Sequence, residues 1–176
     1  MKEELNQMIE KKTSQSIEDR EDKLMIEVRD IFRGEVIDRT ESDSVIVFVI
    51  EGTIYVSVGN KHNSFVSRNK MFLISPGMHW AIDCLDEGAL LFCHLKNLTQ
   101  LCERLKLESL LHEKKKVPTT GKQVDLMVLD VNHFVEHSVK GLNMLVRSGV
   151  KYEYLLENII MEILLLIRMY YPKEAL

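Results

Sequence analysis

The chain has 176 residues, of which 45% are hydrophobic and 28% charged, a balance typical of one soluble globular domain with its own core. Its formal net charge of -4 at pH 7 excludes a protein that binds nucleic acid through a broad basic surface. The cysteines Cys84, Cys93 and Cys102 form no C-x-x-C motif and leave one unpaired, which argues against a disulfide or zinc framework and favours a reducing, cytoplasmic location.

Residues 1–23 are mostly charged and polar and contain no apolar signal segment, so we predict a charged N-terminal arm. Residues 24–96 have a different pattern, in which short apolar runs alternate with turn residues. The runs are LMIEVRDIF, EVID, VIVFVI, TIYVSV, SFVS, MFLI, HWAIDC and ALLFCHL. Their β-branched and aromatic side chains favour the pleated surface of a sheet, and about eight such strands predict a β-sandwich or barrel with jelly-roll character.

Two of the runs differ in how their apolar residues are placed. VIVFVI is apolar on both faces and predicts a central strand, whereas TIYVSV alternates and predicts a strand with one exposed face. The turn residues Glu51-Gly52 and Gly59-Asn60 each predict a tight hairpin between the strands on either side.

We predict that residues 97–119 form a linker with a possible short helix, and that residues 120–176 form two helices. Thr120-Gly121-Lys122-Gln123 has the spacing of a capping box, so the first helix is expected to begin there and to run to about Arg147. The second is expected to run from about Tyr152 to Tyr171, where Pro172 ends it. Its acidic and basic residues interrupt the apolar run, so we expect no membrane span.

The segment HFVEH, His133 to His137, matches the H-x-x-E-H signature of a zinc peptidase family. On a helix the two histidines and Glu136 share one face, and most apolar residues of the segment lie on the opposite one. A catalytic zinc ion needs a third protein ligand in a dry cavity, and nothing in the sequence prepares one. We therefore predict a solvated helix face and no metal site; adventitious metal binding by the two histidines stays open.

The second helix is apolar on two sides. A broad arc from Leu155 to Tyr171 would face the barrel and the first helix, and Met161, Leu165 and Met169 form a separate strip on the far side. A helix that is apolar on two sides must be covered on two sides, so we predict that this strip is the seam of a homodimer. The alternative is a helix buried wholly within its own chain.

Barrel and helices together resemble the N-terminal sensor region of AraC-type transcription regulators. The resemblance rests on VIVFVIEGTIYVSVGNKHNSFVSRNKMFLISPGMHW and on the tail YEYLLENIIMEILLLIRMYYPKEAL, and it covers about residues 30–176. It implies an α+β fold that is mainly β: a cupin-like jelly-roll barrel followed by an antiparallel helix pair. It also implies a small-molecule effector, a homodimer, and contact with DNA only through a helix-turn-helix domain absent from this chain, which we expect to be a truncated regulatory half.

The sequence departs from the metal-binding members of the cupin class. The strands contain no H-x-H pair, and Trp80 stands where a ligand histidine is expected, with His79 one residue out of register. We therefore expect no metal, no other cofactor and no catalytic residues, and we place the ligand pocket at Tyr55, Trp80, Phe92 and His94.

Simpler readings exist for the same residues. Trp80 could serve only to pack the core, His94 could be a buried strand histidine with a backbone partner, and the cysteines are more typical of inert core thiols than of nucleophiles. Two alternative functions stay open. One is a small cupin-fold metal-dependent enzyme, a dioxygenase or isomerase, and the other is a barrel that has lost its ligand and serves only for oligomerisation.

Overall fold

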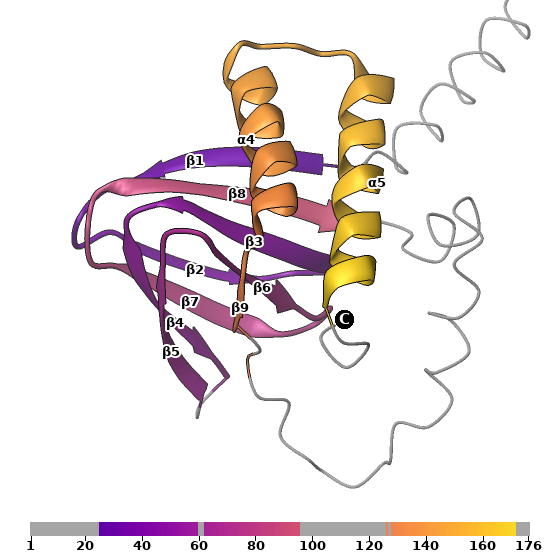
Figure 1. Cartoon of the computed structure of the whole chain (residues 1–176). Helices are drawn as coiled ribbons and strands as arrows, with labels where there is room; N and C mark the ends of the chain where they lie inside the picture. The colour runs from indigo at the N-terminus through magenta and orange to yellow at the C-terminus, as the bar shows by residue number, and fades with distance from the viewer. Residues whose placement is uncertain (1–24, 60–61, 96–125, 127, 172–176) are drawn as a thin grey trace, which may run out of the picture.

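The computed structural model describes residues 25–59, 62–95, 126 and 128–171 of the chain, which form nine strands and two helices (Figure 1). The strands are β1 (Met25–Ile31), β2 (Val36–Thr40), β3 (Ser44–Glu51), β4 (Thr53–Val58), β5 (His62–Ser67), β6 (Lys70–Ile74), β7 (His79–Cys84), β8 (Gly88–Leu95) and β9 (Val128–Asp130). The helices are α4 (His133–Arg147) and α5 (Glu153–Tyr170). Among these described residues no helix combines the length and apolarity needed to cross a membrane.

The strands form two antiparallel sheets, with the orders β1-β8-β3-β6-β9 and β2-β7-β4-β5. Strand β1 pairs with β8, β2 with β7, β3 with β6 and β4 with β5, as in a long hairpin of eight strands wrapped around a core. This pairing is that of a jelly roll. The predicted fold class, a jelly-roll barrel followed by a helix pair, is confirmed, and all eight predicted runs form strands.

The two predicted hairpins have different outcomes. Strands β4 and β5 pair up to Val58 and His62, so the turn that contains Gly59 is a hairpin as predicted. The Glu51-Gly52 prediction is wrong, because β3 and β4 lie in different sheets and the turn carries the chain from one sheet to the other. Gly52 has a φ of +90°, and a Cβ there would lie 2.9 Å from the Glu87 carbonyl oxygen, so this crossing requires glycine.

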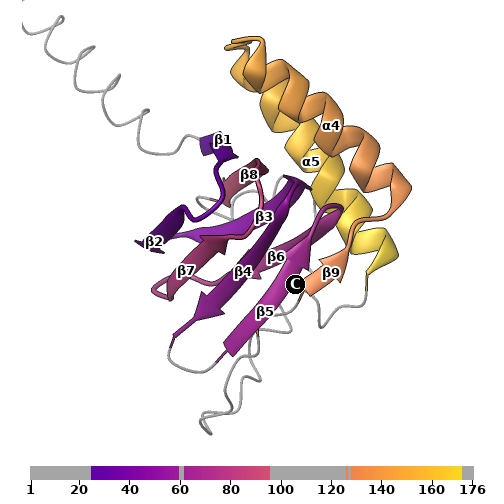
Figure 2. The same cartoon turned by 90° about the vertical axis from the view of Figure 1, so that its left-hand side faces the viewer.

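Each sheet has one face in the interior between the sheets. The inner cluster includes Val45, Val47, Val56, Trp80, Ile82 and Phe92, which alternate along their strands with residues of the opposite face. The outer face of the first sheet is also covered, since Ile46, Phe48, Met71, Leu91 and Cys93 pack under α4 and α5 (Figure 2). Strand β3 is therefore apolar on both faces, and β4, in the sheet that α4 and α5 do not cover, is buried only at alternate residues, as predicted.

The first helix begins later than predicted. Val128–Asp130 is strand β9, which pairs with β6 at the sheet edge, and α4 starts at His133. The Asn132 side chain caps this helix by accepting hydrogen bonds from the backbone nitrogens of Phe134 and Val135. The capping-box residues 120–123 lie outside the described part of the chain. Helix α5 has the predicted bounds to within one residue at each end.

Both helices are tied to the sheet by polar contacts at their ends. The Tyr171 hydroxyl, just after α5, accepts a hydrogen bond from the backbone nitrogen of Asn132 at 2.9 Å and donates one to the Asp130 carbonyl at 2.5 Å. At the other end of the pair, the Arg147 guanidinium at the end of α4 bonds to Asp30 of β1. The helix pair is thus attached to both edge strands of the first sheet.

Candidate functional site

Three of the four predicted pocket residues lie together inside the barrel. Trp80 on β7 is fully buried, and its ring centroid lies 6.0 Å from that of Phe92 on β8. His94 follows Phe92 by two residues on the same face of β8 and is 4% exposed. The core-packing reading of Trp80 therefore holds, and the same packing brings Trp80 and His94 to one end of the barrel.

Tyr55 is not part of this group. It lies on the outer face of β4, next to the exposed ring of Phe65 at a centroid distance of 4.7 Å. The strand alternation that buries Ile54 and Val56 turns Tyr55 outward, so we correct its placement and leave it out of the pocket.

Glu41 joins the group from the loop that follows β2, and sequence reasoning missed it. One of its carboxylate oxygens, Oε2, lies 3.6 Å from His94 Nδ1, and the Glu41 side chain is 12% exposed. The loop is held by a hydrogen bond from the Gly77 nitrogen to the Glu41 carbonyl at 2.8 Å. Its residues, ESDS, have the composition of a solvated turn, so no local signal could have indicated burial.

Three buried polar atoms at this end of the barrel make no hydrogen bond with any described residue: Glu41 Oε1, Trp80 Nε1 and His94 Nε2. Burying a polar group without a partner costs about 1–3 kcal/mol, and folded proteins therefore carry few of them. Finding three on one loop and on one strand from each of the two facing sheets marks this barrel end as the candidate functional site.

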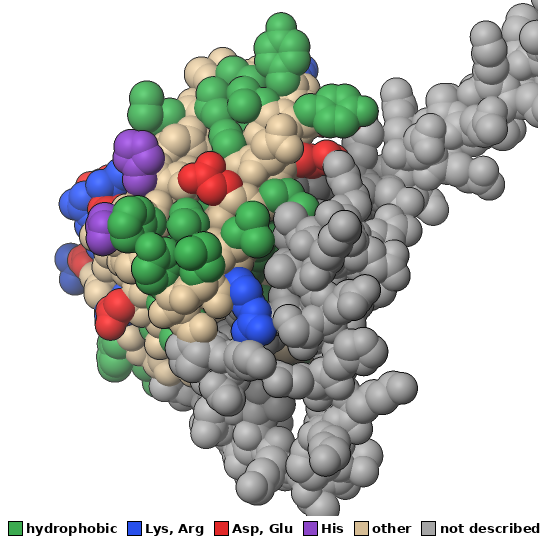
Figure 3. Space-filling model, turned by 45° about the vertical axis from the view of Figure 1, so that its right-hand side comes forward, with side chains coloured by type: hydrophobic (Ala, Val, Ile, Leu, Met, Phe, Trp, Pro, Cys, Tyr) green, Lys and Arg blue, Asp and Glu red, His purple; other side chains and the backbone are tan. Residues whose placement is uncertain are grey.

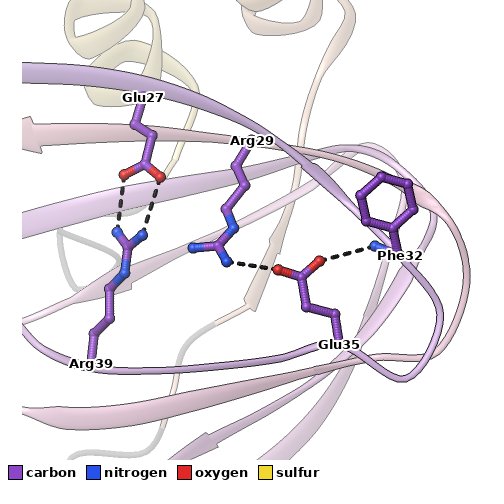
Figure 4. A network of polar contacts seen from close by, with 5 residues as sticks. All are labelled: Glu27, Arg29, Phe32, Glu35 and Arg39. Carbon is purple, nitrogen blue, oxygen red and sulfur yellow. Dashed lines mark hydrogen bonds and ion pairs between the residues drawn. The ribbon is translucent and has the colours of Figure 1, made fainter.

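Two ion pairs lie beside the site, between the edge strands β1 and β2, which face each other (Figure 4). Arg39 donates to both carboxylate oxygens of Glu27 at 2.9 and 3.1 Å, and Arg29 donates to Glu35 at 2.6 Å. The Arg39 guanidinium also lies 5.6 Å from the Phe92 ring centroid. These contacts close the barrel's side between two strands that share no backbone ladder.

The hydrogen bonds from Arg39 hold the pKa of the Glu27 carboxyl below its usual range. A carboxyl whose pKa is lower in the folded state stabilises the fold above its ordinary pKa and loses that contribution as pH falls. We expect Glu27→Gln to lower the free energy of unfolding by about 1 kcal/mol at pH 7. Urea unfolding at pH 7 and at pH 3 measures the difference, which should shrink at the lower pH.

Glu87→Gln is the matched control, because Glu87 is exposed in the turn before β8. Its unfolding free energy should follow the wild-type value at both pH values. A Glu27→Gln deficit of equal size at pH 7 and pH 3 would show that the loss comes from packing and not from the ionised pair.

The buried cysteines are unreactive. Burial raises the pKa of the Cys84 thiol to about 11 and that of the Cys93 thiol to about 12. Both therefore stay protonated at neutral pH and pack as small apolar side chains, as expected. Cys102 lies outside the described residues.

The HFVEH segment lies at the start of α4, where His133 and His137 are exposed and the Glu136 side chain pairs with Lys140 at 2.6 Å. The prediction that this face is solvated is confirmed. Within the ranges that the structure describes, no three His, Cys, Asp or Glu side chains are placed to hold a metal ion.

The helix pair carries exposed apolar side chains on the face turned away from the sheet (Figure 3). Leu165 and Met169, two of the predicted seam residues, are 38% and 72% exposed, and the third, Met161, is half-buried. Phe134 of α4 stacks on Tyr170 of α5 at 5.2 Å, which extends this apolar surface across both helices.

Comparison of the sequence with known proteins gives no assignment. No protein-family model matches the chain, and no curated protein matches it at a significant level.

Comparison of the structure finds cupin proteins. The chain is similar to an RmlC-like cupin family protein from Methanocaldococcus jannaschii, with a TM-score of 0.39 and 10% identity over 48% of this chain and 77% of that chain. It is also similar to a cupin domain from Schizosaccharomyces pombe (TM-score 0.40, 14% identity, 47% of this chain and 62% of that one). A third is hydroxypropylphosphonic acid epoxidase from S. wedmorenis (TM-score 0.38, 15% identity, 41% and 43%).

The chain spans less than two thirds of the length of the last two proteins. These likenesses are loose, and the jelly-roll assignment rests on the strand pairing described above.

Proposed function

We propose that this chain is the effector-sensing and dimerisation domain of an AraC-type transcription regulator. In this proposal a small molecule binds inside the barrel without a metal ion, and two copies associate through the helices. DNA would be contacted through a separate helix-turn-helix domain.

The observation that carries the sensor proposal is the group of buried polar atoms without partners at the barrel end. A ligand that bonds to Trp80 Nε1 and His94 Nε2 would remove an energetic penalty that the free protein carries. Binding would therefore favour the conformation in which these atoms are correctly placed, which is how a ligand shifts a conformational equilibrium.

The dimer proposal is supported by the exposed apolar face of the helix pair. It carries Phe134, Met144, Leu155, Leu165, Met169 and Tyr170, each more than a third exposed. A surface of this kind is typical of a protein interface, and a twofold dimer would cover the same residues in both copies. The helices pack on the outer face of the first sheet, and the inner face of the same sheet lines the barrel, so the ligand site and the helix pair lie on opposite faces of one sheet.

The test of the sensor proposal is a thermal-shift screen of the purified chain against a library of small metabolites, followed by calorimetry of each hit. A specific ligand raises the melting temperature in proportion to the logarithm of its concentration. Loss of that shift in Trp80→Phe would place the ligand in the barrel. Stoichiometric iron, manganese or zinc in the purified protein, or turnover of a compound by it, would contradict the proposal in favour of a cupin enzyme.

A further inference from the structure

We propose that the barrel end formed by Glu41, Trp80 and His94 binds a small primary amine that carries a hydroxyl or carbonyl oxygen close to its ammonium group, as ethanolamine does. This inference rests on the proposed sensor function and names the chemical class of its effector.

The hydrogen-bonding capacity of the three atoms defines what fits them. Glu41 Oε1 only accepts hydrogen bonds, and Trp80 Nε1 only donates them. His94 Nδ1 lies 3.6 Å from Glu41 Oε2, and we place the ring hydrogen on Nδ1, facing this carboxylate, so that Nε2 acts as an acceptor. The site therefore offers two acceptors and one donor. An ammonium group supplies hydrogens for both acceptors, and a neighbouring hydroxyl or carbonyl oxygen accepts from Trp80.

The charges at the site also favour a cationic ligand. Two carboxylates, Glu27 and Glu41, face this end of the barrel, and Arg39 already donates to both oxygens of Glu27. No described residue donates a hydrogen bond to Glu41 Oε1, so the negative charge of this carboxylate is not offset by a bonded donor at that oxygen. A cationic ligand would neutralise this charge, whereas an anionic ligand would add a second one to a site of low dielectric constant.

The surroundings limit the size of the ligand. Trp80 and Phe92 form apolar walls and are fully buried, and the inner cluster around them is closely packed. Glu41 is the member of the group that reaches the surface, because its loop is bonded to the exposed Pro76-Gly77 turn. The ligand therefore enters past Glu41 and is limited to a few heavy atoms beyond the two polar groups.

Three probes of nearly equal size test the class: protonated ethanolamine, ethylene glycol and glycolate, which present a cation, a neutral group and an anion beside the same hydroxyl. Trp80 is the one tryptophan of the 176-residue chain, so intrinsic fluorescence reports on this site alone. We expect ethanolamine to change the Trp80 emission with a Kd in the millimolar range, about tenfold or more below that of either isostere.

Two variants assign the effect to Glu41. Glu41→Gln keeps the shape of the side chain but removes its charge, so it should abolish ethanolamine binding. It should also raise the melting temperature of the free protein by about 3 °C, because a buried charge without a bonded cation is removed. Asp43→Asn removes one charge from the same loop, where the Asp43 carboxylate accepts a hydrogen bond from the neighbouring Ser42 hydroxyl, and should bind ethanolamine as the wild type does.

The outcomes separate this inference from the sensor function. Preference for glycolate or ethylene glycol, or equal binding by Glu41→Gln, overturns the amine class and leaves a small-molecule sensor in place. If none of the three probes changes the Trp80 emission, the amine class is also overturned. The sensor function falls only if the metabolite screen also yields no ligand that depends on Trp80.

Discussion

Gly88→Ala is expected to destabilise the protein by about 3 kcal/mol or more, because it forces two strands apart. A Cβ at this position would lie 2.0 Å from the Glu51 carbonyl oxygen and 2.5 Å from its carbon. Both are backbone atoms, so no side-chain rotation relieves the clash. The site lies where the pairing of β3 with β8 shifts register, between Val49 and Glu51. Urea unfolding followed by circular dichroism measures the loss.

Gly141→Ala is the matched control. Gly141 lies within α4, and nothing comes within 4 Å of the Cβ that alanine would add. Alanine favours a helix more than glycine does, so this variant should gain about 0.5–1 kcal/mol. If the two variants have the same stability, the close approach of β8 to Glu51 does not exist in solution.

The second large effect concerns the helix face. In the proposed dimer, twofold symmetry would place the carboxylates added by Leu165→Asp in both copies in the same seam, so this variant is expected to be a monomer. We expect the dissociation constant of the dimer to rise by about 100-fold or more. Light scattering coupled to size-exclusion chromatography measures the mass of the wild type and of the variant at the same concentration.

Val36→Asp is the matched control, because it also replaces an exposed apolar residue by an aspartate. Val36 is 59% exposed on β2, in the sheet that the helices do not cover. This variant should remain a dimer. A wild-type protein that elutes as a monomer at micromolar concentration, or a dimer that survives Leu165→Asp, would remove the helix face from the proposed interface.

The strands and the second helix were predictable because their signals are local. Alternating apolar and polar residues indicate β4, turn residues separate it from its neighbours, and Pro172 marks the end of α5. Strand β9 has only three residues and owes its conformation to β6, where Lys70 pairs with Asp130 at 2.5 Å across 60 residues of sequence. Such a pairing leaves no periodicity in the sequence, so the segment looked like the start of a helix.

The turn at Gly52 and the burial of Glu41 were also missed because they depend on contacts between residues that are distant in the sequence. A glycine between two strong strands indicates a hairpin locally, but the jelly-roll pairing sends β3 and β4 into different sheets. Glu41 lies in a polar turn, and this turn is held by a hydrogen bond from Gly77, distant in the sequence, where the Glu41 side chain lies beside His94. Of the candidate site, sequence reasoning could therefore find Trp80, Phe92 and His94, which alternate along strands, but not the carboxylate that defines its charge.

The Tyr171 hydroxyl bonds at once to the last residue of β9 and to the cap of α4. The end of α5 is thus linked directly to the edge of the first sheet and to the start of α4. Burial raises the pKa of this phenol above its usual range, so the hydroxyl keeps its proton at neutral pH. Tyr171→Phe would remove both hydrogen bonds, while the buried apolar face of α5 would still hold the helix on the sheet.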